Sequence, residues 1–323
     1  MSTIQLSSIL LNNDPINYVA DEALVQAVEI AIALGKPLVV SGEPGTGKTQ
    51  LAHFVASQLH QQTKNDFFPF AEKTLVYNTK SGSSASDLFY HYDAVGHFRN
   101  KEDKPASHFI ELKALGLAIC MAHGKQHPAL KGISSLRQFD TFDEQPKSSV
   151  VLIDEIDKAP RDFPNDLLNE MENYEFDIRE LNQSIRKPSG DARIVVIMTS
   201  NSEKNLPNAF LRRCVFYHIP FPDKEKLMTI TRKRMAIGNN HYDRILNEAI
   251  DKFIEYRQQS INKKPATSEF LDWMNILKEF NLLHSNGSFG NYGSVPEQRK
   301  YESSLNVLFK NKEDIDRIIN KTV

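Results

Sequence analysis

The stretch of sequence that decides the fold is Leu38-Val39-Val40-Ser41-Gly42-Glu43-Pro44-Gly45-Thr46-Gly47-Lys48-Thr49. It opens with an apolar run rich in β-branched residues, which is typical of a short buried strand. Residues 42–49 then fit the pattern GxxxxGK[ST], and Leu51, Phe54, Val55 and Leu59 follow at helical spacing. A strand, a glycine-rich loop and a helix therefore follow one another, which is the context that a phosphate-binding loop requires.

This loop predicts a site for a nucleoside triphosphate and a magnesium ion. Glycines allow consecutive main-chain N–H groups to surround phosphate oxygens, and the start of the following helix adds a positive dipole. We expect Lys48 to reach the β- and γ-phosphates and Thr49 to ligate Mg²⁺. The alternative, a glycine-rich turn without a ligand, is disfavoured by the flanking strand and helix. The expected cofactors are ATP and Mg²⁺, and the expected binding residues are Gly42, Glu43, Pro44, Gly45, Thr46, Gly47, Lys48 and Thr49.

Further apolar runs predict the rest of the fold. Residues 75–77, 150–153, 194–198 and 215–219 read as strands separated by helix-length segments, and beyond residue 222 the pattern is helical. The predicted fold class is α/β, with an αβα parallel-sheet domain of the P-loop NTPase type followed by a smaller all-helical lid domain. We expect an N-terminal segment at 1–18, the nucleotide-binding domain at 19–221, the lid at 222–284, and a linker with a C-terminal helical segment at 285–323.

A pair of acidic residues closes the strand predicted at 150–153. Asp154 is expected to hold Mg²⁺, because the carboxyl ends of parallel strands gather where the ligand binds. Glu155 is expected to polarise the water that attacks the γ-phosphate. A buried strand that simply ends in solvated acids is the alternative, and the loop at 42–49 argues against it. Asp157 and Lys158, which follow, are expected to be surface charges.

Four motifs together resemble the AAA+ superfamily, and more closely its MoxR-like branch. They are GEPGTGKT (42–49), VLIDEIDKAP (151–160), MTSN (198–201) and LPNAFLRRC (206–214), and the resemblance covers most of residues 20–222. It implies an AAA+ nucleotide domain with a helical lid, a homo-oligomer in the form of a hexameric ring, and ATP bound between neighbouring subunits. It also implies a protein client, and commonly a partner with a von Willebrand factor A domain.

The resemblance assigns further residues by their position in these motifs. Asn201 looks like the sensor that orients the attacking water, although an asparagine after a strand is also a common turn residue. Arg212 and Arg213 resemble the arginine finger that reaches a neighbour's ATP, and Arg213 is preferred. Capping of a helix end is the alternative for both arginines. The family also places an arginine at the start of a lid helix; residues 265–273 contain none, which leaves Arg232 and Arg234 as candidates.

Two insertions resemble the hairpins of the same branch. Residues near 89–98 carry aromatic side chains around an expected turn at 93–96, and residues 174–187 alternate apolar and charged positions with the period of a strand. In the functional interpretation Tyr90, His91 and Tyr92 grip a substrate or partner in the pore of the ring. In the alternative these side chains pack the insertion on its own domain.

Composition narrows the function without deciding it. Hydrophobic residues make up 40% and charged residues 25% of the chain, as in ordinary folded proteins, and the net charge is −2. This balance disfavours a nucleic-acid-translocating motor of a restriction or defence complex, since tracking phosphates needs clustered Lys and Arg. A third possibility, a nucleotide-gated switch with little turnover, is disfavoured by Glu155. No run reaches the roughly 18 apolar residues of a membrane span, so we expect a cytoplasmic protein without a membrane partner.

Overall fold

The chain forms two compact units in a computed structural model. The sheet unit comprises Ala20–Gly42 and Lys48–Ile219, and the helical unit comprises Glu43–Gly47 and Pro220–Val323 together with the start of the chain. The structure describes residues 14–100, 104–134, 136, 138–188, 190, 192–201, 203–235, 243–283, 289–290 and 292–322. Residues 1–13 of the segment expected at 1–18, and residues 285–288 and 291 of the linker expected within 285–323, lie outside these residues.

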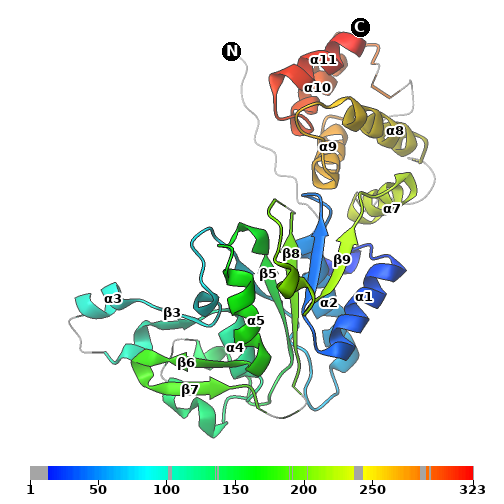
Figure 1. Ribbon diagram of the computed structural model, residues 1–323. Coiled ribbons are helices and arrows are strands. Elements are labelled where there is room, and N and C mark those ends of the chain that lie inside the picture. The colour runs from blue at the N-terminus through cyan, green and yellow to red at the C-terminus, as the bar shows by residue number, and fades with distance from the viewer. Residues whose placement is uncertain are drawn as a thin grey trace. The chain divides into compact units, whose positions relative to one another are not determined.

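The sheet unit is built on five parallel strands (Figure 1). They are β1 (Leu38–Gly42), β2 (Leu75–Asn78), β5 (Ser149–Asp154), β8 (Ile194–Ser200) and β9 (Val215–Ile219), in the order β2-β5-β8-β1-β9. All five strands were predicted, because a parallel sheet covered on both faces needs nearly continuous apolar runs. Since β1 lies between β8 and β9, the loop after β1 leaves the sheet at its carboxyl edge, beside the end of β8.

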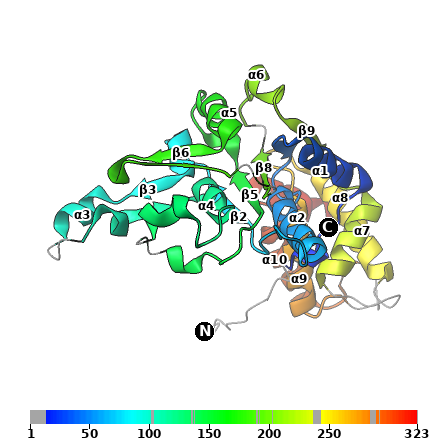
Figure 2. The same ribbon diagram turned by 90° about the horizontal axis from the view of Figure 1, so that it is seen from below.

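Helices cover both faces of this sheet (Figures 1 and 2). α1 (Glu22–Leu34) and α2 (Lys48–Thr63) lie on one face, and α4 (Ala114–Met121) and α5 (Phe163–Asn173) lie on the other. The second face holds a core in which Val151, Ile153 and Val196 pack with buried residues of α4 and α5. Asp21 caps α1 by accepting a hydrogen bond from the Leu24 amide at 2.8 Å, as its position in the sequence predicts. The αβα fold class is therefore confirmed.

The first insertion differs from the hairpin expected at 89–98. β3 (Tyr90–Tyr92) pairs antiparallel with β4 (Ile110–Leu112), and the residues expected to turn at 93–96 instead begin helix α3 (Ala94–Arg99). Asp93 accepts a hydrogen bond from the Gly96 amide, which makes it a helix cap and not a hairpin turn. The excursion from the sheet is therefore longer than the sequence pattern suggested.

The second insertion is an antiparallel hairpin of β6 (Glu175–Ile178) and β7 (Gln183–Arg186). It lies within the stretch 174–187 where the alternation predicts one. Phe176 of this hairpin stacks on Phe89, with ring centroids 5.2 Å apart. Both views place the two insertions on the same side of the sheet unit (Figures 1 and 2).

The helical unit has one core. Its helices are α7 (Lys224–Met235), α8 (Asp243–Gln259), α9 (Thr267–Glu279), α10 (Val295–Ser304) and α11 (Lys312–Thr322). Trp273 of α9 is fully buried and donates from its indole N–H to Ser304 of α10 at 2.9 Å, and Tyr256 of α8 hydrogen-bonds Tyr301 of α10 at 2.9 Å. The structure thus joins the C-terminal segment expected at 285–323 to the helical region expected at 222–284.

Shorter elements complete the described part of the chain. α6 (Asn208–Leu211) precedes β9, and 3₁₀ helices occupy Pro15–Asn17, Ala85–Leu88, Ala106–Phe109, Pro128–Ile133, Phe139–Thr141, Ile156–Lys158, Arg179–Leu181 and Leu305–Val307. None of the helices that the structure describes has the length and apolar character needed to cross a bilayer.

Replacing Gly116 by alanine tests the packing of α4. A Cβ at this position would come 2.1 Å from the carbonyl oxygen of Phe89, which is backbone and cannot rotate away. Gly116→Ala should therefore lower the free energy of unfolding by about 1–3 kcal/mol, measured by urea denaturation. Gly82→Ala is the matched control, because a Cβ there meets nothing within 4 Å. Equal unfolding midpoints for the two variants would contradict this packing.

Candidate functional site

A single carboxylate joins three elements at the carboxyl edge of the sheet. Asp154, the last residue of β5, accepts a hydrogen bond from the hydroxyl of Thr199 in β8 at 2.6 Å. It also accepts from the hydroxyl of Thr49 in α2, at 3.1 and 3.3 Å from its two oxygens. Hydroxyl and carboxylate oxygens are the ligands that Mg²⁺ prefers, and Mg²⁺ is usually held by one or two carboxylates together with substrate phosphates. The donor set of Thr49 and Asp154 therefore fits the metal that the sequence predicts.

Lys48 places a buried cation at the start of the helix that follows the loop. Lys48 is the first residue of α2, only 6% exposed, and its ammonium donates to the carbonyl oxygen of Gly42 at 2.8 Å. This hydrogen bond joins Lys48, near the end of the loop, to Gly42 at its beginning. A partly desolvated ammonium held at this point is suited to an anionic ligand.

The tip of the loop has the backbone conformation that phosphate binding needs. Gly45 and Gly47 adopt φ of 75° and 89°, which side chains other than glycine rarely tolerate. Thr46 closes the turn, since its amide and its hydroxyl both donate to the carbonyl oxygen of Glu43, at 3.4 and 2.8 Å. Positive φ at alternate residues makes a concave row of amides, which is an anion-binding arrangement.

Glu155 has a strained backbone, and its amide and both carboxylate oxygens have partners. Its φ is 55°, in the left-handed region, which costs a residue with a side chain about 1–2 kcal/mol. Its amide donates to the Thr199 hydroxyl at 2.8 Å, and one carboxylate oxygen accepts from the side-chain amide of Asn201 at 2.9 Å. The other oxygen pairs with Lys158, and this hydrogen bond raises the pKa of Lys158. The structure thus brings Glu155 and Asn201 into direct contact.

Asp157 has a role that the sequence analysis missed. It is 2% exposed, and its carboxylate accepts hydrogen bonds from the amides of Asn201 and Glu203 at 3.3 and 2.9 Å. The expectation of a surface charge was therefore wrong for Asp157. Its carboxylate fixes the chain directly after β8, and with it the position of the Asn201 side chain that contacts Glu155.

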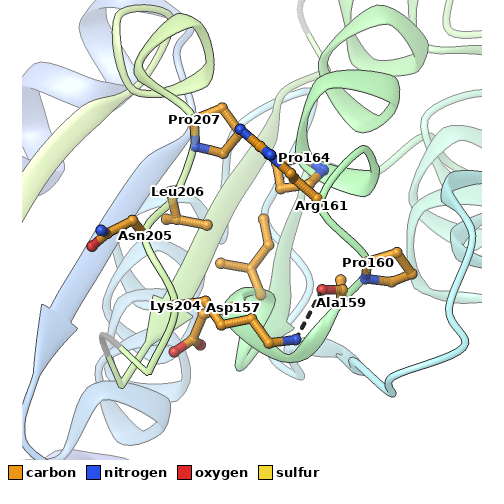
Figure 3. A pocket seen from close by; sticks show the side chains of 10 residues that line it. Asp157, Ala159, Pro160, Arg161, Pro164, Lys204, Asn205, Leu206 and Pro207 are labelled. Atoms are coloured by element: carbon orange, nitrogen blue, oxygen red, sulfur yellow. Dashed lines mark hydrogen bonds between the residues drawn. The ribbon is translucent and has the colours of Figure 1, made fainter.

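A pocket of about 390 Å³ is lined by residues that follow the acidic pair in the sequence and by residues that follow β8 (Figure 3). Lys204 donates to the carbonyl oxygens of Lys158 and Ala159, at 3.2 and 3.4 Å, and so ties the two walls together. The lining residues are Ile156, Asp157, Ala159, Pro160, Arg161, Pro164, Lys204, Asn205, Leu206 and Pro207. Since residues 42–49 do not line it, the candidate site is defined by the hydrogen bonds around Asp154 and Glu155 and not by this pocket.

The arginines proposed from the sequence belong to both units: Arg212 and Arg213 to the sheet unit, and Arg232 and Arg234 to the helical unit. Arg212 and Arg213 follow α6 with exposed side chains. Arg232 pairs with Asp243 at 2.8 Å, and burial lowers the pKa of Arg234.

The aromatic residues of the first insertion are partly packed. The Tyr90 hydroxyl accepts from the amide of Arg179 at 3.4 Å, and the Tyr92 hydroxyl hydrogen-bonds His97 at 2.6 Å. His91 is exposed, and Phe98 of α3 is 93% exposed. The side chains most available to a partner are therefore His91 and Phe98, while the two tyrosines support the insertion itself.

Comparison with known families decides what kind of protein this is. A family model described as "ATPase family associated with various cellular activities (AAA)" matches residues 38–222, which is more than half of the chain. The chain belongs to the AAA family. The matched region contains the phosphate loop, the acidic pair and Asn201.

Solved structures of one other protein are similar to this chain. They are three variants of RuvB from Thermotoga maritima, each 15% identical. The proline-to-glycine variant has a TM-score of 0.49 and covers 97% of this chain and 79% of its own. The threonine-to-valine and lysine-to-arginine variants each have a TM-score of 0.45, and each alignment covers 93% of this chain and 73% of the variant's own chain. No curated protein matches the chain significantly.

Replacing Asp157 tests its role in this AAA site. Asp157→Ala leaves the amides of Asn201 and Glu203 without their acceptor, which should destabilise the protein by about 1–3 kcal/mol. Turnover of ATP should fall as well, because Asn201 then loses its position beside Glu155. Asp162→Ala is the control, since Asp162 is exposed and its side chain makes no capping hydrogen bond to α5. Thermal unfolding and phosphate release measure the two effects; wild-type values for both would rule the role out.

Proposed function

We propose that this protein is a magnesium-dependent ATPase that works as a ring and remodels or activates a protein partner. The observation that carries the proposal is the hydrogen-bonded chain Thr49–Asp154–Thr199–Glu155–Asn201 at the mouth of a phosphate loop. It combines a metal-ligand pair with a carboxylate and an amide suited to orienting water. Membership of the AAA family supports ATP-driven activity in general.

The residues of the loop and of the acidic pair have distinct tasks in the proposed reaction. Lys48 and the loop amides bind the triphosphate, and Thr49 and Asp154 hold Mg²⁺, which when bound neutralises phosphate charge. Glu155 orients and polarises the attacking water as general base, with Asn201 fixing one of its oxygens. The second oxygen pairs with Lys158, and the remaining lone pairs of the carboxylate are left to accept a proton from water.

The arginines at the end of α6 suit a site shared between subunits. Arg213 is exposed and lies within the matched family region, so its side chain is available to another copy of the chain. A planar guanidinium stabilises charge spread over the equatorial phosphate oxygens, and an arginine supplied from a second protein can accelerate such reactions greatly. We therefore propose a homo-oligomer, in the form of a hexamer, with Arg213 of one subunit acting on ATP of its neighbour.

The insertions are the proposed contact with the client. Phe98 and His91 are exposed on the first insertion, and they extend from the same sheet that holds the nucleotide site. The resemblance of four motifs to the MoxR-like branch supports a protein client, including one with a von Willebrand factor A domain. A net charge of −2 gives no such support to a nucleic-acid motor. Since the proposed activity consumes ATP, we propose the cytoplasm as its place of action.

Glu155→Gln tests the proposed chemistry. The amide keeps the volume and the hydrogen bond from Asn201 but cannot take a proton, so turnover should fall by about 10²–10⁴-fold while ATP still binds. Calorimetry with ATP and Mg²⁺ measures binding, and phosphate release measures turnover. Glu172→Gln, an exposed position on α5, is the control and should keep full activity. Undiminished hydrolysis by Glu155→Gln would remove this residue from the mechanism.

Mixing two inactive variants tests the shared site. Arg213→Ala should lose turnover yet keep ATP binding, and Lys48→Ala should lose binding. In an equal mixture roughly a quarter of the interfaces pair an intact Lys48 with an intact Arg213, so activity should return in part. Arg212→Ala in place of Arg213→Ala is the matched comparison and identifies which arginine reaches across. A mixture with no activity above that of its components would argue against a composite site.

A further inference from the structure

Arg257, near the end of α8, is held by three different contacts in the helical unit. Its side chain is 11% exposed, and its guanidinium carbon lies 3.7 Å above the ring of Phe221. One terminal nitrogen donates to the carbonyl oxygen of Pro265 at 2.7 Å, and the other donates to the carboxylate of Glu43 at 2.5 Å. Stacking fixes the plane of the guanidinium, and the hydrogen bonds from its two terminal nitrogens fix its orientation within that plane.

The two acceptors belong to segments that touch each other. Glu43 lies in the tip of the phosphate loop, and Pro265 directly precedes Ala266, the N-cap of α9. A Cβ added at Gly45 would come 2.5 Å from the hydroxyl of Ser268 and 2.9 Å from the Cβ of Ala266. The loop tip and the start of α9 are therefore in close contact, and Arg257 binds both of them.

We propose that Arg257 is a positioning residue for the phosphate loop. It acts through Glu43: the ion pair holds the tip Glu43–Gly47 against the start of α9, in the conformation that presents its amides to the triphosphate. Arg257 itself touches no reacting atom. The inference rests on the proposed binding of ATP by this loop and adds a residue that none of the sequence motifs contains.

Charge gives Arg257 a second effect on the same loop. Glu43 places a carboxylate next to the amides that are to receive a triphosphate, and like charges at such distances repel. Arg257 pairs with this carboxylate and so offsets its negative charge. Loss of Arg257 therefore both frees the loop tip and leaves an uncompensated negative charge beside the phosphates, whereas loss of the Glu43 charge removes the repulsion.

The test is a double-mutant cycle between Arg257 and Glu43, with affinity for a non-hydrolysable ATP analogue and Mg²⁺ measured by calorimetry. Arg257→Gln should weaken binding about tenfold, the size expected for one direct ionic contact. Glu43→Gln should weaken it less, and the double variant should bind as Glu43→Gln does. Arg244→Gln is the control, because Arg244 lies on the same helix and pairs with Glu248 on the surface. Additive losses in the double variant, or a control that loses as much, would overturn the inference.

Hydrogen exchange of the nucleotide-free protein provides a readout that does not depend on ATP. The amides of residues 43 and 45–47 should exchange faster in Arg257→Gln and in Glu43→Gln than in wild type. Glu43→Gln keeps the packing of Arg257 on Phe221, so it decides the matter even if Arg257→Gln does not fold. Unchanged exchange at the loop would refute the positioning role while leaving the ATPase proposal intact. Wild-type protein that binds no ATP analogue would instead refute the ATPase proposal.

Discussion

The candidate site depends on the carboxylate of Asp154. This one group accepts the hydroxyls of Thr49 and Thr199, and so connects the helix after the phosphate loop to two neighbouring strands. The Thr199 hydroxyl in turn accepts a hydrogen bond from the amide of Glu155, so the position of Glu155 is fixed by the same strand β8. Because each hydroxyl serves an acidic partner, a small displacement of β5 or β8 would disturb the metal-ligand pair and the proposed base together. Parallel register between these strands is therefore a chemical requirement as well as a structural one.

Much of this arrangement could be predicted from the sequence for identifiable physical reasons. Parallel strands covered on both faces have to be apolar along their length, so each strand can be recognised in the sequence as an apolar run such as 150–153. A phosphate loop needs glycines at positive φ and a lysine at a fixed spacing. Both requirements restrict the residue type at fixed positions, so they can be recognised in the sequence. The placement of Asp154 followed because the ends of parallel strands meet at one edge of a sheet.

Other features depend on contacts between segments distant in the sequence, and these could not be predicted. Asp157 looks like any acidic residue after a strand; only the chain after β8, more than forty residues later, supplies the amides that bury it. Helices α10 and α11 follow a polar stretch that resembles a linker, yet Tyr301 and Ile318 enter the core of the helical unit. Asp93 was read as a turn residue because a cap and a turn favour the same side chains.

The phosphate loop belongs to two packing environments. Its ends, at Gly42 and Lys48, belong to the sheet unit, and its tip, at Glu43–Gly47, packs within the helical unit. Gly47 and Lys48 are consecutive, so a change in the tip passes directly to the lysine that is to meet the phosphates. Glu155 meanwhile has both oxygens engaged, by Asn201 and Lys158. Different contacts therefore hold the loop tip and the Glu155 carboxylate: the tip packs with residues of the helical unit, and Glu155 is held by residues of the sheet unit.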